Sequence, residues 1–99
     1  MRYEFDAVLW QWQARTDSWT FVSLPAAVAD EVLDLAGPVT RGFGSVRVEV
    51  TVGRTTWRTS IFPDSKAGTY VLPIKKAVRR AEGLEADGTV RLAVTLVDL

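Results

Sequence analysis

The sequence predicts a small, mostly-β domain with two short helices, folded as a single unit over residues 1–99. Three observations indicate this class. Apolar and polar residues alternate along several short segments, which is typical of strands with one buried face. Two Leu-Pro steps are each followed by apolar residues at helical spacing and then by a glycine. The hydrophobic content of 47% is enough for a chain of 99 residues to form one core.

The N-terminal part predicts a strand and its hairpin partner. Residues 3–12 alternate, residues 13–18 form a polar turn, and residues 19–23 return as the second strand. Aromatic side chains lie on both faces of the first strand, with Trp10 and Trp12 sharing one face. Aromatic rings on both faces indicate that one set lines a pocket or a dimer interface, because the core can contact only one face.

The first helix is expected directly after this hairpin. Pro25 suits the first helical position, where its missing N–H group would have no partner in any case. Val28, Val32 and Leu35 follow at helical spacing and predict the buried stripe. The Gly-Pro step at 37–38 ends the helix.

The middle of the chain predicts a second hairpin. Residues 46–52 carry valine at every second position, which is the clearest strand pattern in the chain. Gly53 and Arg54 have the Gly-X form of a two-residue type II′ turn. Residues 55–62 return as a strand, and residues 63–68 read as a loop.

The last third predicts a short strand, a second helix and a final strand. Residues 69–72 form the short strand, Pro73 opens the helix, Gly83 ends it, and residues 89–97 form the last strand. The helix is expected to bury one apolar stripe: Ile74, Ala77, Val78 and Ala81. Its outer face carries a cluster of cations: Lys75, Lys76, Arg79 and Arg80.

The two helical regions have matching surroundings. Both run strand, Leu-Pro, helix, glycine, strand, with Leu24 matching Leu72 at an offset of 48 and Gly44 matching Gly88 at an offset of 44. This internal pseudo-repeat favours a closed, pseudo-two-fold sheet with one helix over each end. The alternative is chance similarity, because short strands and proline-started helices are common.

Composition restricts the chemistry. The chain has no cysteine and no histidine, so it has no disulfide, no thiolate nucleophile and no imidazole base, and zinc sites are improbable. We therefore predict no catalytic residue, no metal site and no cofactor, and we favour a non-enzymatic function. The charged, alternating start is unlike a signal peptide, and no segment is long enough to span a membrane. A cytoplasmic location is expected.

Three patterns that can carry chemistry have simpler explanations. The Gly-Phe-Gly stretch at 42–44 resembles the start of a dinucleotide fingerprint, but a strand follows it, which favours a turn or bulge. Glu4 and Asp6 share a strand face, which more often is solvated than catalytic. Ser65 and Lys66 lie in a loop that is expected to be exposed to water, where a lysine lacks the burial that it needs to act as a base.

The cations and aromatic residues give the best binding hypothesis. Residues 41–80 carry nine basic and two acidic side chains, although the net charge of the chain is zero. An aromatic floor surrounded by cations and a hydroxyl suits a small anionic ligand. The candidate binding residues are Trp57, Arg58, Thr59, Tyr70, Lys75 and Arg79. A protein partner and a homodimer stay open. A nucleic-acid-binding or transcription-linked module is the alternative, less favoured because the chain is neutral and has no arginine-rich tail.

Three segments resemble a known family: GFGSVRV at 42–48, WRTSIFP at 57–63 and YVLPIKKAVR at 70–79. With Trp19 and Pro25 they are similar to a bacterial family of small β-barrels catalogued as a domain of unknown function. The resemblance covers nearly the whole chain and implies a double-split, pseudo-symmetric barrel. It implies no activity, so no catalytic residue is carried over. The positions that match the family pattern are Trp19, Pro25, Gly42, Gly44, Trp57, Pro63, Tyr70, Pro73, Lys75 and Arg79.

Overall fold

The structure, a computed structural model, describes residues 1–14, 17–37 and 44–97. Seven strands and two helices make up this part of the chain. They are β1 (Arg2–Val8), β2 (Trp10–Ala14), β3 (Asp17–Ser23), α1 (Ala26–Ala36), β4 (Val46–Val52), β5 (Thr55–Asp64), β6 (Thr69–Pro73), α2 (Lys76–Glu82) and β7 (Thr89–Leu96). The predicted class, mostly β with two short helices, is confirmed.

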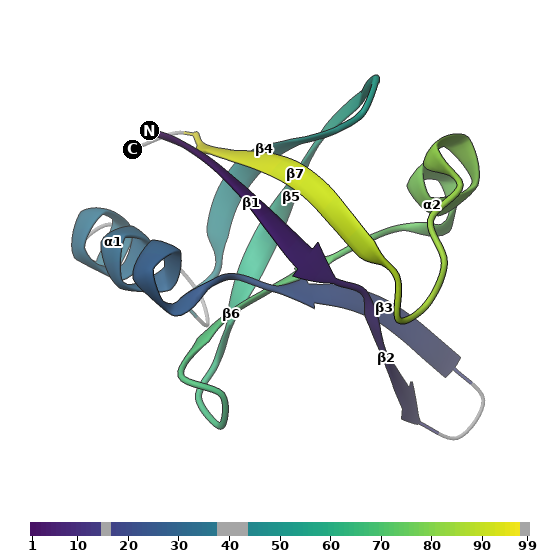
Figure 1. The fold of residues 1–99 in the computed structure, drawn as a ribbon. Helices are drawn as coiled ribbons and strands as arrows, with labels where there is room; N and C mark the ends of the chain where they lie inside the picture. The colour runs from purple at the N-terminus through teal and green to yellow at the C-terminus, as the bar shows by residue number, and fades with distance from the viewer. Residues whose placement is uncertain (15–16, 38–43, 98–99) are drawn as a thin grey trace.

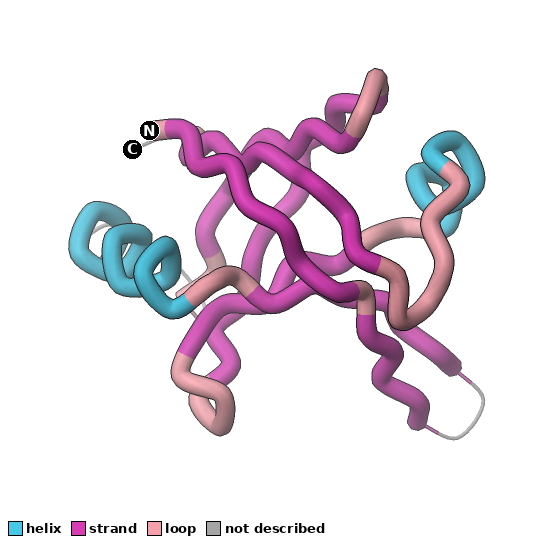
Figure 2. The backbone as a smooth tube through the Cα atoms, in the orientation of Figure 1, coloured by secondary structure: helices cyan, strands magenta, loops and turns pink. Residues whose placement is uncertain are grey.

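All seven strands belong to one antiparallel sheet in the order β1-β7-β4-β5-β6-β3-β2. The sheet is strongly curled, as the path of the magenta strands in Figure 2 shows. The helices lie on opposite sides of it, α1 at the left, where it follows β3, and α2 at the right, between β6 and the start of β7 (Figure 1). The curl gives the sheet a concave inner face, which the core fills.

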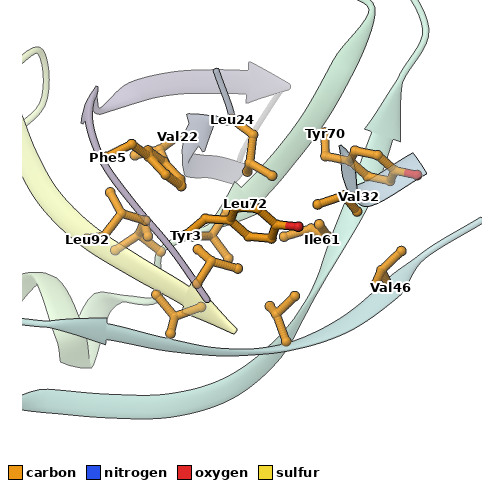
Figure 3. Packing of buried hydrophobic residues seen from close by; sticks show 14 of the residues in the cluster. Tyr3, Phe5, Val22, Leu24, Val32, Val46, Ile61, Tyr70, Leu72 and Leu92 are labelled. Atoms are coloured by element: carbon orange, nitrogen blue, oxygen red, sulfur yellow. The ribbon is translucent and has the colours of Figure 1, made fainter. Parts of the chain in front are cut away.

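The core consists of the inward-facing side chains of the strands, closed by a few residues beside or within the helices (Figure 3). Its largest fully buried side chains are aliphatic: Leu9, Val22, Val32, Val48, Val50, Ile61, Leu72, Ile74, Val78, Leu92 and Val94. Valine dominates because a β-branched side chain packs well on a pleated surface.

The first predicted strand is two strands in the structure. β1 pairs with β7, whereas β2 pairs with β3, and Leu9 separates them. Leu9 is fully buried, its N–H donates to the carbonyl oxygen of Gly88 (2.9 Å), and its carbonyl accepts from the N–H of Asp87 (2.9 Å). These bonds to the turn before β7 fix the point where the chain changes partners. The predicted hairpin is confirmed for β2 and β3, and its turn is shorter than 13–18 because strand residues occupy both ends of that range.

The central hairpin agrees with the sequence pattern. β4 has the predicted bounds, and its valines are buried. Gly53 has a φ of 56°, as the first residue of a type II′ turn requires. β5 runs to Asp64, so the predicted loop at 63–68 begins two residues late. Of the predicted turn at 42–44, only Gly44 belongs to the described residues.

The apolar stripe of α1 differs from the predicted one. The buried residues are Ala29, Val32 and Ala36, whereas Leu35 is exposed and Val28 only partly buried. Pro25 is the N-cap, one residue before the helix, and Pro38 lies outside the described residues. Both stripes satisfy helical spacing. The structure turns the two alanines inward because their small side chains let the helix pack close to the sheet.

The second helix begins later than its proline. Pro73 is the last residue of β6, and α2 starts at Lys76. Val78 is the buried residue of this seven-residue helix, while Ala77 and Ala81 are exposed, which corrects the predicted stripe. A helix of only two turns is too short to bury a stripe of four residues against the sheet. The predicted end is confirmed, since Gly83 adopts the left-handed conformation with a φ of 62°.

Two strand pairs have registers with the same offsets as the matching sequence segments. In the β3–β6 pair Ser23 lies opposite Val71, and in the β4–β7 pair Val50 lies opposite Val94. These partners are separated by 48 and 44 residues, the same offsets that relate the Leu-Pro steps and the Gly-x-Val-Arg segments.

Candidate functional site

The candidate site forms where β6 passes into α2. After Pro73 the N–H of Ile74 donates to the carbonyl oxygen of Thr20 on β3 (2.8 Å), which extends the β3–β6 pairing by one bond. Lys75 remains extended, with φ −69° and ψ 155°, and serves as the N-cap of α2. The buried side chain of Ile74 anchors this segment in the core. Lys75 is thereby held at the surface, where the helix begins.

A groove of about 550 Å³ lies against this segment. Such a volume is within the range of small-molecule sites. Three parts of the chain line it: Trp19 and Thr20 of β3; Trp57, Arg58 and Thr59 of β5; and Pro73, Ile74, Lys75, Lys76 and Arg79 around the start of α2. The described lining holds four cations and no acidic side chain, so the groove favours anions.

Arg79 is the best-positioned of these cations. One helical turn after Lys75, it is half-buried, and its Nε donates to the carbonyl oxygen of Ile74 (3.2 Å). That bond uses one of the five N–H donors of the guanidinium and fixes its direction. The other four donors belong to the planar group that binds carboxylate and phosphate oxygens in pairs.

The β5 side of the groove combines aromatic and polar groups. Trp57 is half-buried and packs against the core, and Thr59 lies on the same strand face. Arg58 alternates to the other face, where its Nε donates to Oε2 of Glu49 (3.3 Å), its partner in the β4–β5 register. An exposed ion pair of this kind is weak, so Arg58 can exchange Glu49 for another anion.

Five of the six residues predicted from the sequence line this groove: Trp57, Arg58, Thr59, Lys75 and Arg79. The structure places the sixth, Tyr70, elsewhere. Tyr70 is buried, packs near Val32 (Figure 3), and lines a separate depression with Asp30 and Leu33 of α1. Alternation along β6 turns Tyr70 to the same face as Leu72, which is the core face. Whether the groove binds a ligand stays a prediction.

The groove also contains residues that the sequence did not indicate. Trp19, Thr20, Pro73 and Ile74 belong to it because β3 pairs with β6. That pairing joins segments about 50 residues apart, so it cannot be predicted from the pattern of either segment alone. Lys76 was visible in the sequence only as one member of the cationic helix face.

The free energy of unfolding is expected to fall as the pH rises above about 10, the ordinary pKa of tyrosine. Burial raises the pKa of Tyr3, with the Glu31 carboxylate adding to the effect, and burial also raises the pKa of Tyr70. The unfolded chain then loses protons that the folded chain keeps, so it binds fewer protons and stability decreases with pH. Urea unfolding between about pH 8 and pH 11 measures this slope. The double variant Tyr3→Phe/Tyr70→Phe should show a shallower slope, and an unchanged slope would contradict the assignment.

The structure places the other candidate residues of the sequence, Glu4, Asp6, Ser65 and Lys66, at exposed positions. Among the described residues no cluster of acidic side chains is suited to hold a metal ion. Glu4 and Asp6 lie exposed on β1, and Oδ1 of Asp6 faces a guanidinium nitrogen of Arg91 at 3.6 Å. Ser65 and Lys66 are exposed in the turn between β5 and β6. Neither helix of the described chain has the length and apolar character needed to cross a membrane.

Comparison with models of protein families gives a match. The model of a family described as a domain of unknown function (DUF1905) matches residues 5–94. This range includes every described residue of the groove. None of the curated proteins matches the chain.

Proposed function

The chain belongs to the family of domains of unknown function DUF1905, and we propose that it is a non-enzymatic domain that binds a small anionic ligand in the groove beside α2. The observation that supports this function is a concavity of about 550 Å³ in which Lys75, Lys76 and Arg79 line the same space as a half-buried tryptophan. A ligand with a phosphate or carboxylate group fits this arrangement. Lys75 and Lys76 would neutralise it, Arg79 would orient it, and Trp57 would cover its apolar part.

Charge, rather than shape alone, is expected to decide the affinity of this groove. The variant Lys75→Gln/Lys76→Gln removes two cations that form no ion pair with another described residue. Each lost charge-assisted hydrogen bond is worth about 1.5–3 kcal/mol, so phosphate affinity should fall at least about tenfold. Thermal shift with inorganic phosphate and ribose 5-phosphate, with uncharged ribose as the comparison, measures it. A ligand at a hundredfold its Kd adds about 2.7 kcal/mol of stability.

The matched control is Lys66→Gln. Lys66 is exposed in the turn between β5 and β6 and does not line the groove. This variant should keep full affinity. An equal loss of phosphate affinity in Lys66→Gln would mean that the overall positive charge of the surface, and not the groove, attracts the anion. A flat response of the parent protein to all phosphate compounds would refute the proposal.

A nucleic-acid-binding or transcription-linked module is the second candidate. Lys76, Arg79 and Arg80 also line a neighbouring depression of about 330 Å³, so three cations continue beyond the groove along α2, next to the acidic Glu85. A single strand of nucleic acid would contact this surface through its backbone. Its affinity would fall steeply with salt concentration, whereas a small ligand held by two or three groups would depend on salt more weakly.

We also propose that the curled sheet is a closed, double-split, pseudo-symmetric barrel. β5 pairs with β4 through residues 55–61 and with β6 through residues 62–64, so it joins two parts of the sheet. β1 and β2 do the same for β7 and β3 on either side of Leu9. Each of these two long segments would then be one split strand of the barrel. An approximate two-fold axis would relate them, which is supported by the pairing of Ser23 with Val71 and of Val50 with Val94, because residues related by such an axis pair with each other where it passes between antiparallel strands. The cytoplasmic location and the single domain over residues 1–99 stay predictions.

A further inference from the structure

The outer face of β2, β3, β6 and β5 carries a continuous row of apolar side chains. Trp12 pairs with Trp19, Phe21 with Pro73, and Phe62 with Val71. Directly opposed residues of antiparallel strands point to the same face, and so do residues two apart on one strand. All members therefore share one face, which we call the aromatic row: Trp12, Trp19, Phe21, Phe62, Val71 and Pro73.

The aromatic row lies on the outer face of the sheet and therefore does not belong to the core. The opposite face of the same strands holds buried residues such as Val22 and Leu72. An antiparallel sheet with one buried face normally carries polar residues on the other. Here Trp12, Trp19 and Phe62 are 51%, 53% and 42% exposed. A contiguous exposed apolar surface indicates binding.

Two rings of the row lie nearly parallel to each other. The rings of Trp19 and Phe21 stack with a centroid distance of 6.4 Å and an interplanar angle of 15°. The row borders a depression of about 340 Å³. No described residue of α1 or α2 lines this depression. A planar group can therefore lie against these rings.

This surface is continuous with the cationic groove. Trp19 and Pro73 line both the groove and the depression over the aromatic row. A molecule that fills both sites carries an anionic group at one end and a flat aromatic group at the other. Two adjoining depressions of about 550 and 340 Å³ match one small molecule, which favours a free ligand over a long strand.

We propose that the ligand is a nucleoside monophosphate. Its phosphate binds Lys75, Lys76 and Arg79 in the groove, and its base stacks on the aromatic row beside Trp19. This assignment rests on the anion-binding function proposed above and adds the chemical class of the ligand. Bases of every kind have a stacking face, so the row predicts affinity for nucleotides without strong preference among them.

The test compares adenosine monophosphate with ribose 5-phosphate by isothermal titration calorimetry. Adenosine monophosphate should bind at least about tenfold more tightly, since stacking of one base contributes about tenfold to hundredfold. Trp12→Ala should remove most of this difference and leave the affinity for ribose 5-phosphate unchanged, because Trp12 belongs to the row but not to the groove. Trp12→Phe should restore it. Leu33→Ala, an equally exposed apolar position on α1, should change neither affinity.

The possible results separate the two proposals. Equal affinities for both compounds, unaffected by Trp12→Ala, would overturn the nucleotide assignment and leave the anion groove intact. Failure of both compounds to bind would refute the anion groove itself. Binding of oligonucleotides alone would overturn the free nucleotide as the ligand. Dimerisation in sedimentation that Trp12→Ala abolishes, without any nucleotide effect, would assign the row to a second copy of the chain instead.

Discussion

Replacing Leu72 by alanine is expected to lower the free energy of unfolding by about 2–5 kcal/mol, the range for truncating a buried leucine. Leu72 is completely buried on the core face of β6, directly opposite Val22 of β3. Truncation leaves a cavity in a sheet whose strands cannot move together without breaking their pairing. Urea unfolding followed by tryptophan fluorescence measures the loss, with the slope m reporting whether the surface exposed on unfolding is unchanged.

The neighbouring residue provides the matched control. Val71 lies next in the same strand but on the outer face, where it is only half-buried. Val71→Ala should cost about 1 kcal/mol or less, because it leaves no closed cavity. Similar losses for Leu72→Ala and Val71→Ala would contradict the assignment of the two faces of β6, and with it the position of the aromatic row.

Strands were predictable where alternation and burial agree along the whole segment. In β4 a valine at every second position leaves one face to the core, and the glycine after Val52 marks the turn. Shifting this strand by one residue would expose every valine, so only one register is stable. The local pattern therefore determined both the strand and its end.

The same periodicity could not show where a strand changes partners. Alternation continues through Leu9 without interruption, yet β1 and β2 belong to different edges of the sheet. Helical spacing was equally ambiguous in α1, where Val28-Val32-Leu35 and Ala29-Val32-Ala36 both form one stripe. Distant packing decides such cases, because the pattern of each segment is compatible with both outcomes.

The sequence could predict those parts of the candidate site whose residues form short local clusters. Residues 57–59 and 75–79 combine aromatic, hydroxyl and cationic side chains, and both segments reach the groove. The position of Tyr70 was also within reach of the sequence, because alternation places it on the face of Leu72. The contribution of Trp19 was not, since it depends on the pairing of β3 with β6.

A carboxylate of α2 contacts the turn between β4 and β5. Glu82, the last residue of α2, accepts a hydrogen bond at Oε2 from the hydroxyl of Thr55 (2.6 Å). The same carboxylate occupies the space next to Gly53, where a Cβ atom would overlap it. Gly53 also has a φ of 56°, a conformation that costs other residues about 1–2 kcal/mol. The absence of a side chain at Gly53 thus permits both the turn and the attachment of the helix.

Gly53→Ala is therefore expected to destabilise the protein by about 2–4 kcal/mol, as backbone strain adds to loss of the Thr55–Glu82 hydrogen bond. Arg54→Ala, in the same turn, should change the free energy of unfolding by less than about 0.5 kcal/mol, because Arg54 is exposed and its φ is not positive. A double-mutant cycle with Glu82→Ala separates the two terms. With the carboxylate absent, Gly53→Ala should cost only the strain of about 1–2 kcal/mol. If its cost were the same in both backgrounds, Glu82 would not be the group that excludes a side chain at this position.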